Sequence, residues 1–167
     1  PVAFFCDELA SLPDCAGPLH WHTDFEIATA SSGVLDFQVG LRHIRLEAGE
    51  SIFVNENIMH GIRQLSGDKP DPMPNIVFSG DVIAPETDEI YRKYIQPIAC
   101  CDEWVFILFN RKNGWHKEVN GLIKNINCSY NFSTLLDKNV ILKPVFSGKY
   151  SKWLIQKKRF VLVVVKK

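Results

Sequence analysis

The chain has 167 residues, enough for one ordinary domain with a short appendage but too few for two full hydrophobic cores. Hydrophobic residues make up 46% of it and charged residues 23%, which excludes disordered, collagen-like and disulfide-knot classes. The net charge of zero is unevenly distributed: residues 128–167 carry nine basic and one acidic residue, net +8, and residues 1–127 carry ten basic and eighteen acidic residues, net −8.

The first half of the chain consists of short segments with two-residue periodicity, separated by Gly, Asn, Asp and Pro. Such alternation is typical of strands with one buried face. Gly33, Gly40 and Gly49 stand where hairpin turns require a positive φ. These features predict an antiparallel sandwich or barrel. The predicted strands are residues 25–29, 34–39, 41–46, 51–54, 59–65 and 75–79, with a turn-rich loop at 66–72.

Two helices are predicted after the strands. Pro85 suits a first helical position, and apolar residues follow at helical spacing until Pro97, which is expected to end the helix. A second helix is predicted after Asn113, with one apolar stripe that must pack against the barrel wall or another subunit. His116 lies beside the stripe and is expected to be solvated. The residues of the stripe are Trp115, Val119, Leu122, Ile123 and Ile126.

Cysteine usage and hydropathy bear on the compartment. The five cysteines form no CxxC pair and have no regular spacing, which favours reduced thiols over disulfides or a zinc ribbon. The apolar run at 160–165 is far shorter than a membrane span, and the N-terminus lacks the plan of a signal peptide. We therefore expect a cytoplasmic protein with no membrane partner.

The most distinctive chemistry lies in residues 18–26. His20, His22 and Glu26 are even numbers of residues apart, so on strands they face the same side of a barrel. His60, at the start of a later predicted strand, is a fourth candidate. Two imidazoles and a carboxylate on one face form a potential metal-binding site.

These residues resemble the motifs of a known family. His-x-His, three residues, Glu, six residues and Gly33 is similar to the first cupin motif, and Gly49 followed eleven residues later by His60 is similar to the second. The resemblance implies a mainly β fold, a cupin-like antiparallel β-barrel (double-stranded β-helix or jelly roll) followed by one or two short α-helices. A set of three His and one carboxylate suits Fe, Mn, Ni or Zn as a divalent cofactor. The residues implied for metal or ligand binding are His20, His22, Glu26 and His60.

Four positions depart from the cupin motifs. Asp14 stands where the family has glycine before the first His, Asn55 and Asn57 replace a proline and a glycine, and Gln64 replaces an asparagine. Asparagine tolerates left-handed backbone, so the turn before His60 is still compatible with the motif. The departures favour a binding role over a metal enzyme.

The order of elements resembles the sensor half of AraC-type transcription regulators. A His-x-His barrel, a proline-broken loop, a helix near residue 90 and the helix that begins near Trp115 carry this resemblance. It implies a small-molecule effector in the barrel, a homodimer formed through the second helix, and DNA binding by a separate helix-turn-helix domain. We therefore expect a ligand-sensing domain with no catalytic residues, and by analogy a metal-free pocket is favoured. The alternative is a standalone metal-dependent cupin enzyme of the dioxygenase or isomerase type.

The expected domain plan has three parts: a barrel at 1–84, a helical dimerisation segment at 85–127 and a basic tail at 128–167. The tail does not resemble helix-turn-helix sequence. It is explained by a chain cut after the sensor, by a truncated or frame-shifted product, or by a native protein with a basic arm, and the abrupt change in charge favours the second. Contact with DNA is expected only from the tail or from a domain outside this chain.

Several other polar and aromatic residues are interpreted as structural. His43 is expected on the surface, and Trp21 in core or interface packing, because it alternates with the two His residues. Three arginines are expected to be solvated strand residues rather than anion clamps. They are Arg42, Arg45 and Arg63.

Overall fold

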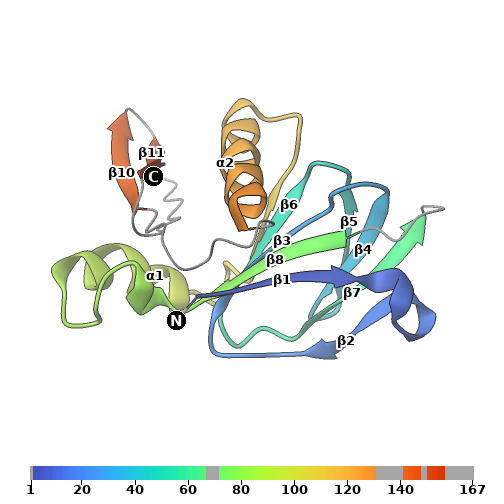
Figure 1. The fold of residues 1–167 in the computed structure, drawn as a ribbon. Helices are drawn as coiled ribbons and strands as arrows, with labels where there is room; N and C mark the ends of the chain where they lie inside the picture. Colours follow the sequence, from blue (N-terminus) through green and yellow to red (C-terminus); the bar gives the residue numbers. More distant parts are fainter. Residues whose placement is uncertain (1, 67–71, 131–140, 148–149, 157–167) are drawn as a thin grey trace.

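The fold consists of two antiparallel β-sheets that face each other, with helices on the outside of one sheet (Figure 1). The computed structural model describes residues 2–66, 72–130, 141–147 and 150–156, and the side chains of residues 2–65 and 73–125. Every neighbouring pair of strands in the two sheets is antiparallel. The predicted mainly β fold is therefore confirmed.

The strands fall into one five-stranded and one four-stranded sheet. The first sheet contains, in spatial order, β1 (Val2–Glu8), β8 (Pro72–Phe78), β3 (Phe25–Thr29), β6 (Ser51–Val54) and β9 (Phe106–Phe109). The second contains β2 (Ala16–His20), β7 (His60–Ser66), β4 (Val34–Val39) and β5 (Arg42–Glu47). A separate hairpin is formed by β10 (Ile141–Ser147) and β11 (Tyr150–Gln156).

The four-stranded sheet buries one face, as its alternating sequence predicts. On β4 the apolar side chains of Leu35, Phe37 and Val39 are buried and their neighbours are partly exposed, and β5 continues the pattern with Ile44 and Leu46. The predicted turn glycines have positive φ angles of 61°, 57° and 80°. The core between the sheets is therefore built by hairpins whose register these turns set. The turn glycines are Gly33, Gly40 and Gly49.

The central strands β3 and β6 of the five-stranded sheet are buried on both faces, which explains why they lack clean alternation. On β3, Glu26 and Ala28 face the inside of the barrel, while Phe25 and Ile27 face a second apolar cluster under the helices. All four residues of β6 are buried. The parity of β3 thus directs one carboxylate inward between two outward-facing apolar residues.

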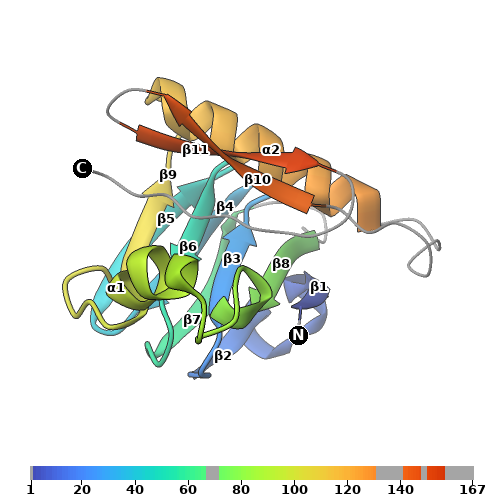
Figure 2. The same ribbon diagram turned by 90° about the vertical axis from the view of Figure 1, so that its left-hand side faces the viewer.

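The helices that follow the barrel cover the outer face of this sheet (Figure 2). Ile95 and Ile98 belong to the outer apolar cluster, together with side chains of β3, β6 and β8. The long helix α2 joins the same cluster. The helical elements are η1 (Leu9–Ser11), η2 (Pro13–Cys15), η3 (Gly80–Val82), η4 (Tyr91–Ile95), α1 (Gln96–Ala99) and α2 (Gly114–Tyr130).

The first predicted helix begins later and runs further than expected. Pro85 opens a turn closed by the Asp88 N–H, and the Asp88 carboxylate accepts a hydrogen bond from the Ile90 N–H at 2.7 Å. Pro97 does not end the helix, since it lies in the first turn of α1. The preceding turn, η4, is a π-helix, and the chain continues through it into α1.

The second predicted helix is confirmed as α2, and its apolar stripe packs against the barrel. Val119 and Ile123 are buried in the outer cluster, and the Trp115 ring meets Phe109 of β9 edge to face at 6.0 Å. Of the two predicted partners of the stripe, it is therefore the barrel wall on which these residues pack. Leu122 is partly exposed, and the side chain of Ile126 lies outside the described residues. A dimer through this stripe stays a prediction, and Val119 and Ile123 are not free to form it.

The six strand predictions were confirmed at or near their bounds, but β1, β2 and β9 of the two sheets were missed. β9 completes the edge of the five-stranded sheet, although it lies inside the segment predicted as helical, 85–127. It is a four-residue apolar run, for which periodicity carries no signal. The apolar run at 160–165 and most of the loop at 66–72 lie outside the described residues. No helix in the described part of the chain is long and apolar enough to cross a membrane.

Asn55 ties the segment after the barrel to the end of β6. Its side-chain Nδ2 donates to the Ile98 carbonyl at 2.8 Å, and its backbone N–H donates to the Val105 carbonyl at 3.0 Å. A proline at this position could make neither bond. The departure from the cupin motif at residue 55 is thus an anchor for the helical segment.

We predict that Asn55→Ala destabilises the fold by about 1–3 kcal/mol, because it leaves the Ile98 carbonyl without a donor in a buried place. The free energy of unfolding from urea denaturation checks this. Gln96→Ala, which removes an exposed amide, is the control and should change stability by less than about 0.5 kcal/mol. Equal effects of the two variants would contradict the anchoring role.

Candidate functional site

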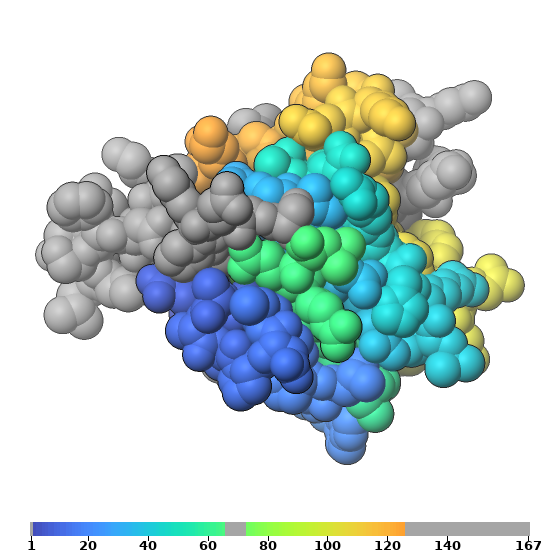
Figure 3. Space-filling model, turned by 90° about the vertical axis from the view of Figure 1, so that its right-hand side faces the viewer, coloured from blue at the N-terminus to red at the C-terminus, as the bar shows by residue number. Residues whose placement is uncertain are grey.

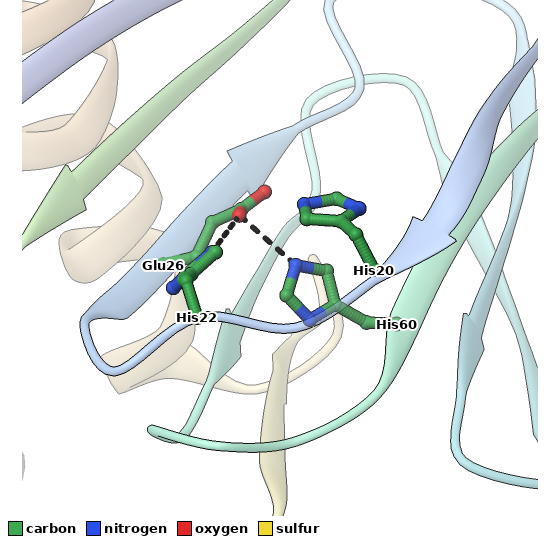
Figure 4. A group of neighbouring side chains, drawn as sticks. All are labelled: His20, His22, Glu26 and His60. Carbon is green, nitrogen blue, oxygen red and sulfur yellow. Dashed lines mark hydrogen bonds and ion pairs between the residues drawn. The ribbon is translucent and has the colours of Figure 1, made fainter.

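Three histidines and one glutamate meet inside the barrel (Figure 4). His20 ends β2, His22 follows it in the loop, Glu26 lies on β3 and His60 begins β7. One potential ligand atom from each lies within 4.8 Å of those from the others. His60 and Glu26 are buried, His22 is partly buried and His20 is exposed. The four residues singled out from the sequence are therefore neighbours in space.

The backbone around the cluster explains this convergence. His20 and His60 are directly paired across β2 and β7. Asn57 has a left-handed φ of 59°, and its N–H donates to the His22 carbonyl at 2.8 Å, which holds the loop that carries His22. Asp14 has φ 55° at the position where cupins have glycine. Both departures thus keep the left-handed backbone that the motif requires.

The three imidazoles are oriented by the backbone. Nδ1 lies 2.9 Å from the Pro18 carbonyl in His20, 2.9 Å from the Asp24 carbonyl in His22, and 2.7 Å from the Ile58 carbonyl in His60. A carbonyl oxygen only accepts, so each Nδ1 carries the hydrogen. The opposite nitrogen, Nε2, then presents a lone pair, as in metal-ligating histidines whose second nitrogen is held by a carbonyl.

Two of these Nε2 atoms face the carboxylate of Glu26. Its Oε2 lies 3.1 Å from Nε2 of His22 and 3.1 Å from Nε2 of His60. When the imidazoles are neutral and the carboxylate is ionised, these contacts bring acceptors together, and a positive charge is needed between them. A proton or a metal ion supplies that charge.

The titration of the pair follows from this contact. Burial raises the pKa of Glu26, but the hydrogen bonds and charges of His60 and His22 outweigh it, so the pKa lies below its ordinary value. Burial lowers the pKa of His60, but the bonds to Glu26 and to the Ile58 carbonyl outweigh it, so this pKa lies above its ordinary value. Glu26 is therefore a carboxylate at neutral pH.

The donor set fits a divalent transition metal. Two ligand atoms bound at about 2.1 Å and at right angles lie about 3.0 Å apart. The two contacts of 3.1 Å at Glu26 match this spacing. Three imidazole nitrogens and one carboxylate oxygen are the donors that Fe, Mn, Ni and Zn accept. The four residues would hold such an ion with little rearrangement.

The cluster lies in the wall of a cavity of about 470 Å³. Strands β1 and β8, which pair with each other, supply part of the lining. Figure 3 shows the N-terminal part of the chain (blue) against a later segment (green). Most of the lining is apolar, and no Lys or Arg of the described part of the chain belongs to it. The volume suits a small organic molecule.

Two polar residues of the cavity, Asp7 on β1 and Asn75 on β8, were missed from the sequence. The Asn75 Nδ2 donates to Asp7 Oδ2 at 3.2 Å. The signal was available in each strand, since both residues are polar members of a face that is otherwise apolar, with Phe5 on one strand and Met73 and Val77 on the other. Because β1 was not predicted as a strand, there was no reason in the sequence to place Asp7 beside Asn75.

Of the other residues interpreted from the sequence, some lie where expected and one does not. His43 is exposed as expected, and its Nδ1 lies 2.8 Å from the Asp36 carboxylate. Trp21 is 60% exposed, so the prediction that it packs in the core is wrong. None of the three arginines lines the cavity. Arg42 lies over the Phe106 ring at 5.9 Å.

His116 was expected to be solvated and is buried instead. Its Nδ1 accepts a hydrogen bond from the Asn110 N–H at 3.2 Å, and its ring contacts Phe109 and Trp115 edge to face. Burial lowers the pKa of His116 below its ordinary value. The helix packs so closely on β9 that a residue beside the stripe is also covered.

Comparisons with known proteins agree with this fold. Residues 11–70 match the cupin domain family model, and no curated protein matches the chain. An apo variant of the AraC-type protein ToxT from Vibrio cholerae aligns with TM-score 0.51 and 9% identity, over 80% of this chain and 48% of that one.

Two smaller proteins are also similar in part. KdgF from Halomonas sp. aligns with TM-score 0.35 and 19% identity, over 38% of this chain and 57% of its own. An RmlC-like cupin from Shewanella frigidimarina aligns with TM-score 0.36 and 20% identity, over 47% and 63%. The chain thus spans less than two thirds of each of these three structures. The fold is the cupin fold, mainly β with two antiparallel sheets and short helices after them, and residues 11–70 are similar to the cupin domain family.

We predict opposite tautomers within the one chain. At a pH where the imidazoles are neutral, His20, His22 and His60 should carry hydrogen on Nδ1, and His116 on Nε2, because their Nδ1 atoms face carbonyl oxygens and an N–H group respectively. Long-range proton–nitrogen NMR spectra of the imidazoles check this. An Nε2–H tautomer at His60 would contradict the orientation derived for the cluster.

Proposed function

We propose that this cupin barrel binds one divalent transition metal ion and uses it to hold a small molecule in the cavity. The observation that carries the proposal is the fixed direction of the three imidazoles. Each Nδ1 is bonded to a backbone carbonyl, so the Nε2 lone pairs of His22 and His60 point at the carboxylate of Glu26, and a ring nitrogen of His20 lies within 4.8 Å of the other ligand atoms. Acceptors gathered in this way are stabilised by a cation. The proposed ligands are His20, His22, Glu26 and His60.

The residues of the chain have separable roles in this proposal. Glu26 and His60 are buried and give the site its rigid base, while the exposed His20 lies on the side that solvent reaches. Phe37 stacks nearly parallel to the His60 ring, with an interplanar angle of 9° and a centroid distance of 6.1 Å, and limits its rotation. The bound ion would supply Lewis acidity toward an oxygen of the small molecule.

We assign this binding to sensing, as in the AraC-type regulators that the sequence resembles. The support is the order of elements and the direct packing of α2 on the barrel through Val119 and Ile123. A ligand that favours one shape of the barrel would bias the position of α2 and of the chain that follows it. In this proposal the protein dimerises through surface other than these two residues. DNA is contacted by a part of the regulator outside the cupin domain.

A metal-dependent cupin enzyme is the second candidate. It is favoured by the position of the cluster in the cavity wall, where a substrate could contact a bound ion directly. The two functions differ in the fate of the small molecule. A molecule recovered unchanged after long incubation with the metal-loaded protein supports sensing, while conversion to product supports the enzyme.

We predict that the untagged protein binds about one equivalent of Co²⁺, Ni²⁺ or Zn²⁺, and that His60→Ala weakens this binding by more than about 10-fold. The reason is that His60 supplies a buried donor that no neighbouring side chain replaces among the described residues. Isothermal titration calorimetry and elemental analysis measure affinity and stoichiometry.

His43→Ala is the matched control, because His43 is an exposed histidine with its own carboxylate partner outside the cavity. It should bind metal as the wild type does, and circular dichroism should show that all three proteins are folded. Absence of stoichiometric metal in the wild type, or equal affinity in the two variants, would refute the metal site.

A further inference from the structure

The cavity is lined by a second polar pair, Asp7 and Asn75, which is separate from the three histidines and Glu26. Asp7 and Asn75 lie diagonally across the paired strands β1 and β8, with Asp7 opposite Met73 and Phe5 opposite Asn75 in the register. Both side chains face the cavity. The 3.2 Å bond from Asn75 Nδ2 to Asp7 Oδ2 fixes the carboxylate there.

Among the described residues this carboxylate has no cationic partner. Asp7 makes no ion pair among the described residues, and the lining of the cavity includes neither Lys nor Arg. Burial raises the pKa of Asp7, and the charge of Glu26 raises it further, while the bond from Asn75 and the charge of His20 lower it. A half-buried carboxylate in such a place is stabilised by a hydrogen-bond donor or a cation that enters the cavity.

The surrounding walls restrict what else the ligand can carry. They are formed largely by Phe5, Leu9, Leu12, Phe37, Ile62 and Met73. A polyhydroxylated molecule such as a free sugar would leave several hydroxyls without partners against these side chains, at a cost for each. An anionic group placed near Asp7 would be repelled by its carboxylate.

We infer that the cavity selects a compact, mainly apolar molecule with a metal-binding oxygen at one end and an amine or other strong hydrogen-bond donor at the other, and that Asp7 is the residue that recognises the donor. The metal-binding end rests on the proposed function. The donor end rests on the geometry of Asp7 and Asn75 alone. Asn75 acts as a positioning residue, because it holds the carboxylate without contacting the ligand in this scheme.

The experiment uses Co²⁺-loaded protein and three benzohydroxamates, which chelate the ion through the same group. The three carry an aminomethyl, a methyl or a carboxyl substituent on the ring, all at the same position, either 3 or 4. The aminomethyl compound should bind about 10-fold more tightly than the methyl compound, as expected of a charge-assisted hydrogen bond, and the carboxyl compound should bind most weakly. Calorimetry gives the affinities, and elemental analysis gives the metal content of each sample.

Asp7→Asn keeps the shape of the side chain and should abolish the preference for the amine without changing metal content or the affinity for the methyl compound. Asp7→Glu keeps the charge and should retain part of the preference, which also guards against a misfolded Asn variant. Asp102→Asn, at an exposed position outside the cavity, is the matched control and should behave as the wild type.

The outcomes separate this inference from the proposed function. Equal affinities for the amine and methyl compounds, a preference that survives Asp7→Asn, or failure of all three compounds to bind metal-loaded protein would overturn the inference and leave the metal site standing. A wild-type protein without metal would overturn both.

Discussion

The hydrogen bonds from three imidazole Nδ1 atoms to backbone carbonyls are the interactions on which the site depends. They belong to the local chain, since each carbonyl lies two residues from its histidine in sequence. They fix the tautomer of each ring and direct the Nε2 lone pairs of His22 and His60 toward Glu26. Without them the rings could rotate and donate to the carboxylate, and the cluster would be an ordinary buried network. With them it is a group of acceptors that needs a cation.

The architecture of the two sheets makes this arrangement possible. The five-stranded sheet is covered by helices on its outer face and faces the cavity with its inner one, so β3 carries Glu26 inward and Phe25 and Ile27 outward. The buried outer cluster keeps that strand in register. The site is thus supported from behind by apolar packing that makes no contact with the ligand space.

The loop before β7 connects these two regions. Asn55 holds the carbonyl groups of Ile98 and Val105, which belong to the segment after the barrel, and Asn57 holds the carbonyl of His22 in the site. Both residues replace the usual cupin proline and glycine, and each makes a bond suited to its own place. The helical segment and the cluster are therefore fastened to one short stretch of chain, which any movement of the helices relative to the barrel would have to accommodate.

The sequence by itself determined the strand periodicity, the turn glycines and the four residues of the cluster, because parity along a strand and left-handed turns are local properties of the chain. The tertiary structure alone decided what faces them. Asp7 and Asn75 lie 68 residues apart and meet only through the pairing of β1 with β8. In the same way, the sequence did not distinguish whether the stripe of α2 packs on the barrel wall or on a second subunit. It also did not determine whether His116 and Trp21 are buried or exposed. Burial depends on which surfaces meet in space, and local periodicity does not encode that.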